Sequence, residues 1–92
     1  MSSYLLRLYI TGNSVNSQRA IANLLKLCKE ELANQYQVEI IDVLEEPDRA
    51  ESEKILVTPT LIKQLPPPLQ RIIGDLSNRE KVLTGLDLIS SS

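Results

Sequence analysis

The stretch Tyr4-Leu-Leu-Arg-Leu-Tyr-Ile10 is almost continuously apolar or aromatic, and it ends at Thr11-Gly12-Asn13. A short apolar run that is bounded by turn residues is typical of a strand buried on both faces of a sheet. We therefore predict that residues 4–10 form the first strand, and that this strand lies in the centre of the sheet.

The segment after this strand predicts a β-α-β unit. A helix is expected over residues 17–34, capped by Asn16 or Ser17, because apolar residues recur at helical spacing at Ile21, Leu24, Leu25, Cys28 and Leu32. Residues 36–44 begin with alternating polar and apolar residues, as in a second strand. A strand, a helix and a strand over this length form a crossover unit with parallel strands.

The middle of the chain is less regular. Asp48 is placed to cap a short helical turn over residues 49–54. Residues 55–62 read as another strand, in which Pro59 belongs on a sheet edge or in a cis turn because proline has no backbone donor. The run Leu65-Pro-Pro-Pro-Leu69 predicts a polyproline-like segment or a turn.

The C-terminal part is expected to add a short edge strand over residues 71–75 and a last helix. Ser77-Asn-Arg-Glu80 matches a capping box, and apolar residues follow at Val82, Leu83, Leu86 and Ile89. Gly85 in the middle of this helix costs about 1 kcal/mol relative to alanine, so the same residues could be partly strand in another packing. The tail over residues 90–92 is expected to be frayed.

Length and composition predict one small globular domain over residues 1–92, with 42% hydrophobic residues, 24% charged residues and a net charge of −2. The chain has no histidine and one cysteine, which argues against zinc sites, disulfides and dithiol chemistry, and we predict neither a metal nor another cofactor. One reduced cysteine and an N-terminus without a secretory signal indicate the cytoplasm.

The charge balance argues against two further classes of partner. Ten Lys and Arg residues stand against twelve Asp and Glu residues, so the chain offers no broad cationic surface for nucleic acid or anionic lipid. Its apolar runs are also far too short to span a membrane. We therefore expect neither nucleic acid nor a membrane as a partner.

The order of the predicted elements, with Thr58-Pro59 interrupting a strand, has the layout of an α/β thioredoxin-like domain. An oxidoreductase of that fold needs a cysteine of low pKa where the first helix begins, but residues 12–17 contain none. Cys28 lies about three turns into the helix on its apolar stripe, so we interpret it as a small buried side chain. A thiol-dependent enzyme remains the alternative from another class, and Cys28→Ser would discriminate, because only an enzyme would lose all activity.

A longer pattern is more specific than this layout. It comprises Leu8-Tyr9-x-x-Gly12-Asn13-x-x-Asn16-Ser17, Ile41-Asp-Val-Leu44, Lys54-Ile-Leu-x-Thr-Pro-Thr60, Leu65-Pro-Pro-Pro68, and residues 71–83 through Gly85-Leu-Asp87. From about Leu5 to Leu88 the chain resembles the KaiB family of circadian clock proteins. The block from Leu65 to Asp87 is long enough to make a chance match negligible.

The resemblance implies a non-enzymatic clock component that binds the ATPase KaiC, opposes the stimulator KaiA and competes with the kinase SasA. It also implies a metamorphic fold. The ground state would be a homotetramer with the order β-α-β-β-α-α-β, and the form that binds KaiC would be a thioredoxin-like monomer with the order β-α-β-α-β-β-α. The conflicting signals in the C-terminal half are of the kind that two packings of similar stability require.

The resemblance also implies site residues. Lys54, Gly85 and Asp87 align with positions linked to KaiC binding or to the fold switch. Arg7 and Arg19 align with basic positions near expected KaiA contacts. Without the resemblance, Lys54 would be read as a solvated lysine, Gly85 as a packing glycine and Asp87 as an exposed helix acid, and Arg7 and Arg19 could equally lie on solvated faces.

The prolines form a candidate switch region. Exchange at X-Pro bonds takes tens to hundreds of seconds, so it could contribute to a high barrier between two folds. The residues concerned are Pro59, Pro66, Pro67 and Pro68.

The chain departs from the family pattern at two positions and at its end. Glu39 stands where lysine is expected, on the edge implicated in engaging KaiA, and Gln70 replaces an expected arginine. An acidic C-terminal extension is absent after Ser92. These departures favour a KaiB paralogue that acts with a divergent KaiC in stress adaptation or auxiliary timing. The isolated sensor domain of a clock kinase is a weaker alternative, because such domains lack the block after Leu65.

Overall fold

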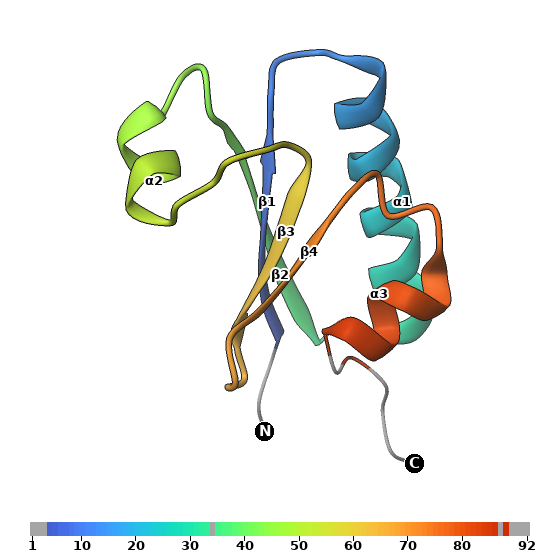
Figure 1. The fold of residues 1–92 in the computed structure, drawn as a ribbon. Helices are drawn as coiled ribbons and strands as arrows, with labels where there is room; N and C mark the ends of the chain where they lie inside the picture. Colours follow the sequence, from blue (N-terminus) through green and yellow to red (C-terminus); the bar gives the residue numbers. More distant parts are fainter. Residues whose placement is uncertain (1–3, 34, 87, 89–92) are drawn as a thin grey trace.

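A four-stranded sheet with helices on both faces forms the structure, a computed structural model that describes residues 4–33, 35–86 and 88 (Figure 1). The elements follow the thioredoxin-like order β-α-β-α-β-β-α, one of the two orders that the resemblance implied. Their bounds are β1 Tyr4–Ile10, α1 Val15–Glu31, β2 Tyr36–Asp42, α2 Pro47–Ser52, β3 Thr60–Leu65, β4 Gln70–Ile73 and α3 Arg79–Gly85.

The sheet has the strand order β2-β1-β3-β4. Strand β1 pairs in parallel with β2 from Tyr4 opposite Tyr36 to Ile10 opposite Asp42, and antiparallel with β3 on its other side. The predicted central strand and the parallel crossover are therefore confirmed. Strand β4 lies at the edge, as predicted, and pairs antiparallel with β3.

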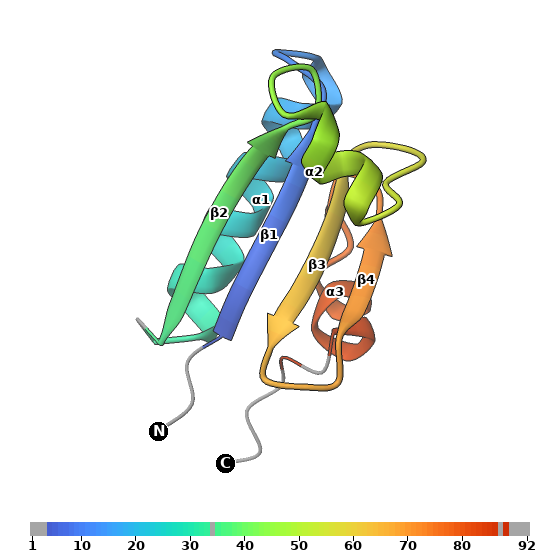
Figure 2. The same cartoon turned by 90° about the vertical axis from the view of Figure 1, so that its left-hand side faces the viewer.

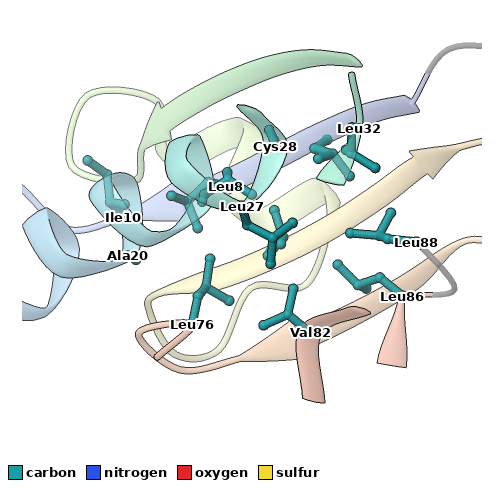
Figure 3. Close-up of a cluster of buried hydrophobic side chains, with 13 residues drawn as sticks. Leu8, Ile10, Ala20, Leu27, Cys28, Leu32, Leu76, Val82, Leu86 and Leu88 are labelled. Atoms are coloured by element: carbon teal, nitrogen blue, oxygen red, sulfur yellow. The ribbon is translucent and has the colours of Figure 1, made fainter. Parts of the chain in front are cut away.

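The two faces of the sheet carry different layers, with α1 and α3 on one face and α2 on the other (Figures 1 and 2). The larger core lies under α1 and α3, where Leu6, Leu8 and Ile10 of β1 contribute with residues of both helices (Figure 3). A smaller cluster of Tyr9, Ile41 and Ile62 belongs to the opposite face. This division follows from the alternation of side chains along a strand.

Helix α1 begins two residues earlier than predicted. Ser14, and not Asn16 or Ser17, is the cap: its backbone is extended, and its Oγ accepts a hydrogen bond from the Ser17 amide at 3.1 Å. The helix ends at Glu31, short of residue 34, and Ala33 has a φ of 46°. Leu27 is buried in place of Leu25, which is exposed.

The middle segment departs further from the prediction. Helix α2 follows Glu46, which makes no side-chain capping bond, and Asp48 lies within the first turn instead of capping it. The third strand begins at Thr60 and not at residue 55, because Pro59 has no amide for the ladder. The Thr58-Pro59 peptide is cis. Of the two predicted settings for Pro59, a sheet edge or a cis turn, the second is therefore the one observed.

Helix α3 is capped by Asn78, one residue after the predicted Ser77. The Asn78 Oδ1 accepts from the Lys81 amide at 3.1 Å, whereas the Ser77 amide donates to Asp75 Oδ1. Gly85 is the last residue of this helix and not its middle. Ile89 and the tail over residues 90–92 lie outside the described residues.

Candidate interaction surface

The sheet face under α2 carries an ion-pair network. The register of β1 and β2 places Arg7 opposite Glu39. Arg7 Nε donates to Glu39 Oε1 at 3.0 Å, and Arg49 Nη1 of α2 donates to Glu39 Oε2 at 2.8 Å and to Glu46 Oε1 at 3.3 Å. Two sequence-predicted residues, Arg7 and Glu39, are therefore in direct contact.

The charges of this network balance. The hydrogen bond from Arg49 is the main reason that the pKa of Glu39 lies below its ordinary value, and Arg7 adds to the effect. Because these side chains are about one-third exposed, solvent screens the pairs and each contributes little to stability. Glu39 and Glu46 together balance the charges of Arg7 and Arg49 at this edge of the sheet.

Lys54 lies in the tight turn after α2. Its φ is 56°, a conformation that residues with a side chain rarely adopt. Its amide donates to the Glu51 carbonyl at 3.0 Å, and Arg71 Nη2 of the edge strand β4 donates to the Glu53 carbonyl at 3.1 Å. The turn is thus fastened from two sides while the Lys54 side chain is exposed.

An exposed apolar segment follows Lys54. Leu56 is 91% exposed and Val57 48%, although both lie between a turn and a strand. They line a pocket of about 130 Å³ with Thr11, Val43, Ile55 and Thr58, and the hydroxyls of Thr11 and Thr58 are 2.6 Å apart.

The sequence interpretation placed Leu56 and Val57 inside a strand and so missed their exposure. Pro59 could have predicted this exposure, because a strand that begins after Pro59 does not include Leu56 and Val57. Exposed apolar side chains beside an exposed lysine suit contact with another protein.

Two other predicted residues lie on the opposite face of the sheet. Gly85 ends α3, where an added Cβ would lie 2.7 Å from Ile72 Cδ1. Arg19 is exposed on α1, close enough to Asp75 to help lower its pKa, although hydrogen bonds from Ser77 are the larger cause. The structure therefore brings neither residue together with Lys54, Arg7 or Glu39, and Asp87 lies outside the described residues.

The prolines occupy two separate places. Pro59 is buried at the start of β3, where its carbonyl accepts from the Gly74 amide at 2.9 Å. Pro66, Pro67 and Pro68 form the predicted turn between β3 and β4, and the peptides before Pro66 and Pro68 are cis. The two groups lie at opposite ends of β3 (Figure 2).

Cys28 is fully buried in the core under α1, which confirms the predicted small buried side chain. Burial raises the pKa of its thiol to about 12. A thiolate is therefore scarce at neutral pH, which disfavours Cys28 as a nucleophile. Among the described helices, none combines the length and apolar character needed to cross a lipid bilayer.

Solved structures with this architecture include domains of unlike sequence. The N-terminal domain of SasA from Synechococcus elongatus is 22% identical with a TM-score of 0.77, and the alignment covers 100% of this chain and 90% of that domain. Mitochondrial thioredoxin 3 of Saccharomyces cerevisiae is 20% identical with a TM-score of 0.74, covering 95% of this chain and 79% of the thioredoxin. These similarities confirm the thioredoxin-like fold.

Sequence relatives are much more similar. The circadian clock protein KaiB3 of Synechocystis is 73% identical over 89 residues, which are 97% of this chain and 87% of that protein. The circadian clock oscillator protein KaiB of Thermosynechococcus vestitus is 56% identical over 87 residues, or 95% of this chain and 81% of the relative. The KaiB domain model matches residues 7–88. The chain therefore belongs to the KaiB family.

Proposed function

We propose that this protein is a non-enzymatic clock component that binds the ATPase KaiC through the surface around Lys54. The observation that carries the proposal is the exposed Lys54 side chain, held on a fastened turn beside the exposed Leu56 and Val57. A cation on a turn whose backbone is held, next to apolar side chains, gives a partner both orientation and buried area. Family membership supports KaiC as that partner.

Binding to KaiC would have two regulatory consequences. The protein would oppose KaiA-stimulated phosphorylation of KaiC, and it would compete with the kinase SasA for KaiC. The second consequence is supported by the fold that this chain shares with the SasA domain. Two domains with the same backbone can present equivalent surfaces to one partner.

We further propose that this thioredoxin-like form is the binding form and that it exchanges with a homotetramer of the other family order. The C-terminal half supports exchange because its last helix, α3, has only seven residues. A helix this short has little stability of its own and depends on packing.

A second candidate function is a KaiB paralogue that acts with a divergent KaiC in stress adaptation or auxiliary timing. Glu39 favours it, because this carboxylate is paired with Arg7 and Arg49 where the family pattern predicts a lysine. On this interpretation KaiA is engaged weakly. The 73% identity to a protein named KaiB3, against 56% to KaiB proteins, also favours it.

Size-exclusion chromatography with light scattering tests the proposal, on the protein alone and after hours with a KaiC hexamer and ATP. Slow conversion to a KaiC-bound monomer is expected, and the absence of any KaiC complex would overturn the proposal. Adding KaiA separates the two roles: a core clock protein recruits KaiA, whereas the paralogue recruits it only after Glu39→Lys.

Variants of Lys54 test the surface itself. Lys54→Ala and Lys54→Gly both remove the cation, but only glycine relieves the positive φ. Both should weaken KaiC binding by about tenfold, since an interaction with a charged group contributes on this scale. Lys26→Ala, on the exposed side of α1, is the matched control. Equal binding by Lys54→Ala and the control would exclude the Lys54 cation from the interface.

A further inference from the structure

The edge strand β4 contacts the segment between α2 and β3, which carries the surface around Lys54, at both ends of that segment. Arg71 of β4 reaches the first end: its Nη2 donates to the Glu53 carbonyl at 3.1 Å, and its Nη1 lies 3.5 Å from the Lys54 carbonyl oxygen. The other end is held by Gly74, the residue after β4, whose amide donates to the Pro59 carbonyl at 2.9 Å. Figure 2 shows the segment passing the end of β4 before it enters β3.

The contact from Arg71 is made to the backbone of the turn at Lys54. Helix α2 ends at Ser52, and the last carbonyls of a helix have no partner within it. A guanidinium has a planar fork of donors that can serve two such carbonyls at once. Because the φ of Lys54 is 56°, a conformation that is costly for a residue with a side chain, the turn depends on contacts of this kind.

The β3–β4 hairpin makes one more contact with the turn. Gln64 Nε2 of β3 donates to Glu53 Oε1 at 3.0 Å. Strand β4 itself has only four residues and lies at the edge of the sheet, where it pairs with β3. Short edge elements open more readily than central ones. The turn therefore loses its contact with Arg71 whenever β4 leaves the sheet.

We propose that Arg71 is a positioning residue for the Lys54 surface, and that this surface is formed only while β4 is paired in the sheet. The identity of the partner, KaiC, rests on the proposed function, but the link between β4 and the turn does not. Such a link is reciprocal: a partner that binds only the formed surface also stabilises β4. Binding at Lys54 thus protects the edge strand without a direct contact to it.

The link is tested first on the protein alone, with an endoproteinase that cleaves after lysine. Lys54 is exposed in its turn, and Arg71→Gln creates no new cleavage site. Since proteolysis follows the population of the open form, cleavage after Lys54 relative to cleavage after Lys26 should rise about fivefold in Arg71→Gln. An unchanged ratio would overturn the link.

Arg79→Gln is the matched control for this experiment. It removes another arginine of the C-terminal half, one that pairs with Glu30 and Glu31 of α1. The relative cleavage after Lys54 should stay unchanged in this variant. A rise equal to that in Arg71→Gln would show only that the C-terminal half has loosened, and it would overturn the specific role of Arg71.

Binding to a KaiC hexamer with ATP tests whether the position of the turn matters to the partner. Arg71→Gln should weaken binding about fivefold. In a Lys54→Ala background the same change should weaken it less than about twofold, because the side chain that Arg71 positions is gone. Additive losses would mean that Arg71 acts independently of Lys54, and they would overturn the positioning role.

Arg71→Lys separates charge from geometry, because it keeps the charge and replaces the fork by a compact ammonium. Its affinity for KaiC should follow the cleavage rate of its Lys54 turn. Full affinity, with a turn that is cleaved as fast as in Arg71→Gln, would show that KaiC contacts the charge itself, and the positioning role would be wrong.

Hydrogen exchange with and without KaiC tests the reverse direction of the link. Bound KaiC should slow exchange of the β4 amides at least about tenfold, and the effect should be smaller in Arg71→Gln. Equal slowing in both proteins, or none in either, would overturn the reciprocal link. If the unmodified protein does not bind KaiC, the proposed function fails, and the cleavage experiment still decides whether Arg71 holds the turn.

Discussion

At the scale of single residues, Lys63 stands out because only 1% of its surface is exposed. It lies in β3 on the same face as the core residue Leu61, between Leu6 and Gln70 of the neighbouring strands. A charged side chain is therefore almost removed from water here, and the Oε1 of the opposite residue, Gln70, is a buried acceptor with no hydrogen-bond partner in the described part of the chain. Buried polar groups without partners cost stability, so this part of the sheet is packed at a penalty.

Replacing Lys63 should therefore stabilise the protein. Methionine has a similar length and no charge, and Lys63→Met should raise the free energy of unfolding by about 1–2 kcal/mol. Urea denaturation measures the change, and Lys26→Met, at an exposed position, should stay within about 0.5 kcal/mol of the unmodified protein. A loss of stability in Lys63→Met would mean that the ammonium has a stabilising partner.

Cys28 gives a prediction that follows from its pKa. With a pKa of about 12, roughly one thiol in ten thousand is ionised at pH 8, and the sulfur is fully buried. The native protein should therefore react with a thiol-specific disulfide reagent at least about 100-fold more slowly than the protein unfolded in urea. Labelling of the native protein at the unfolded rate would contradict the assignment of Cys28 to the core.

At the scale of elements, the sequence predicted the type of each helix and strand better than its ends. The apolar run at residues 4–10, the helical spacing over residues 17–34 and the alternation that begins residues 36–44 predicted two strands and the helix between them, and all three elements form. The caps of α1 and α3 were wrong by one to three residues, because several serines and asparagines stand close together and each of them has a side chain that can cap a helix. Ser14 is the cap because its Oγ accepts from the Ser17 amide, while the Ser17 Oγ accepts from the Thr11 amide and so is not free to cap the helix itself.

The candidate site was less predictable than the fold. The cross-strand pair of Arg7 and Glu39 requires the register of two strands far apart in the sequence. The exposure of Leu56 depends on where β3 begins, and the contact of Arg71 with the Lys54 turn depends on how α2 lies over the sheet. Local patterns contain none of this information, because it arises from packing between distant segments.

The packing of α3 against β4 gives a prediction at this scale. Gly85→Ala gains helix propensity, up to about 1 kcal/mol, but its Cβ would lie 2.7 Å from Ile72 Cδ1, so the two effects oppose each other. Ile72→Val removes that methyl group at a cost of about 0.5–1.5 kcal/mol. The double variant should be about 1 kcal/mol more stable than the sum of the single changes predicts. A double-mutant cycle in urea measures this coupling, and additivity within about 0.3 kcal/mol would contradict the contact.

At the scale of the whole molecule, the two halves are held unequally. The first half combines a seventeen-residue helix with two seven-residue strands and supplies most of the larger core. The second half has the six-residue α2, the four-residue β4 and the seven-residue α3. Arg79 ties α3 to Glu30 and Glu31 of α1, but these pairs are exposed and so contribute little.

This inequality predicts that the C-terminal half opens before the molecule unfolds. In native-state hydrogen exchange, amides of β4 and α3 should show opening free energies at least about 2 kcal/mol below those of β1 and α1. Lys63→Met should raise the values in β3, β4 and α3 more than those in α1, because it removes a penalty that the second half contains. Equal opening free energies throughout would mean that the protein unfolds as one unit. The proposed exchange between two folds would then lack an intermediate in which the C-terminal half is open while the first half stays folded.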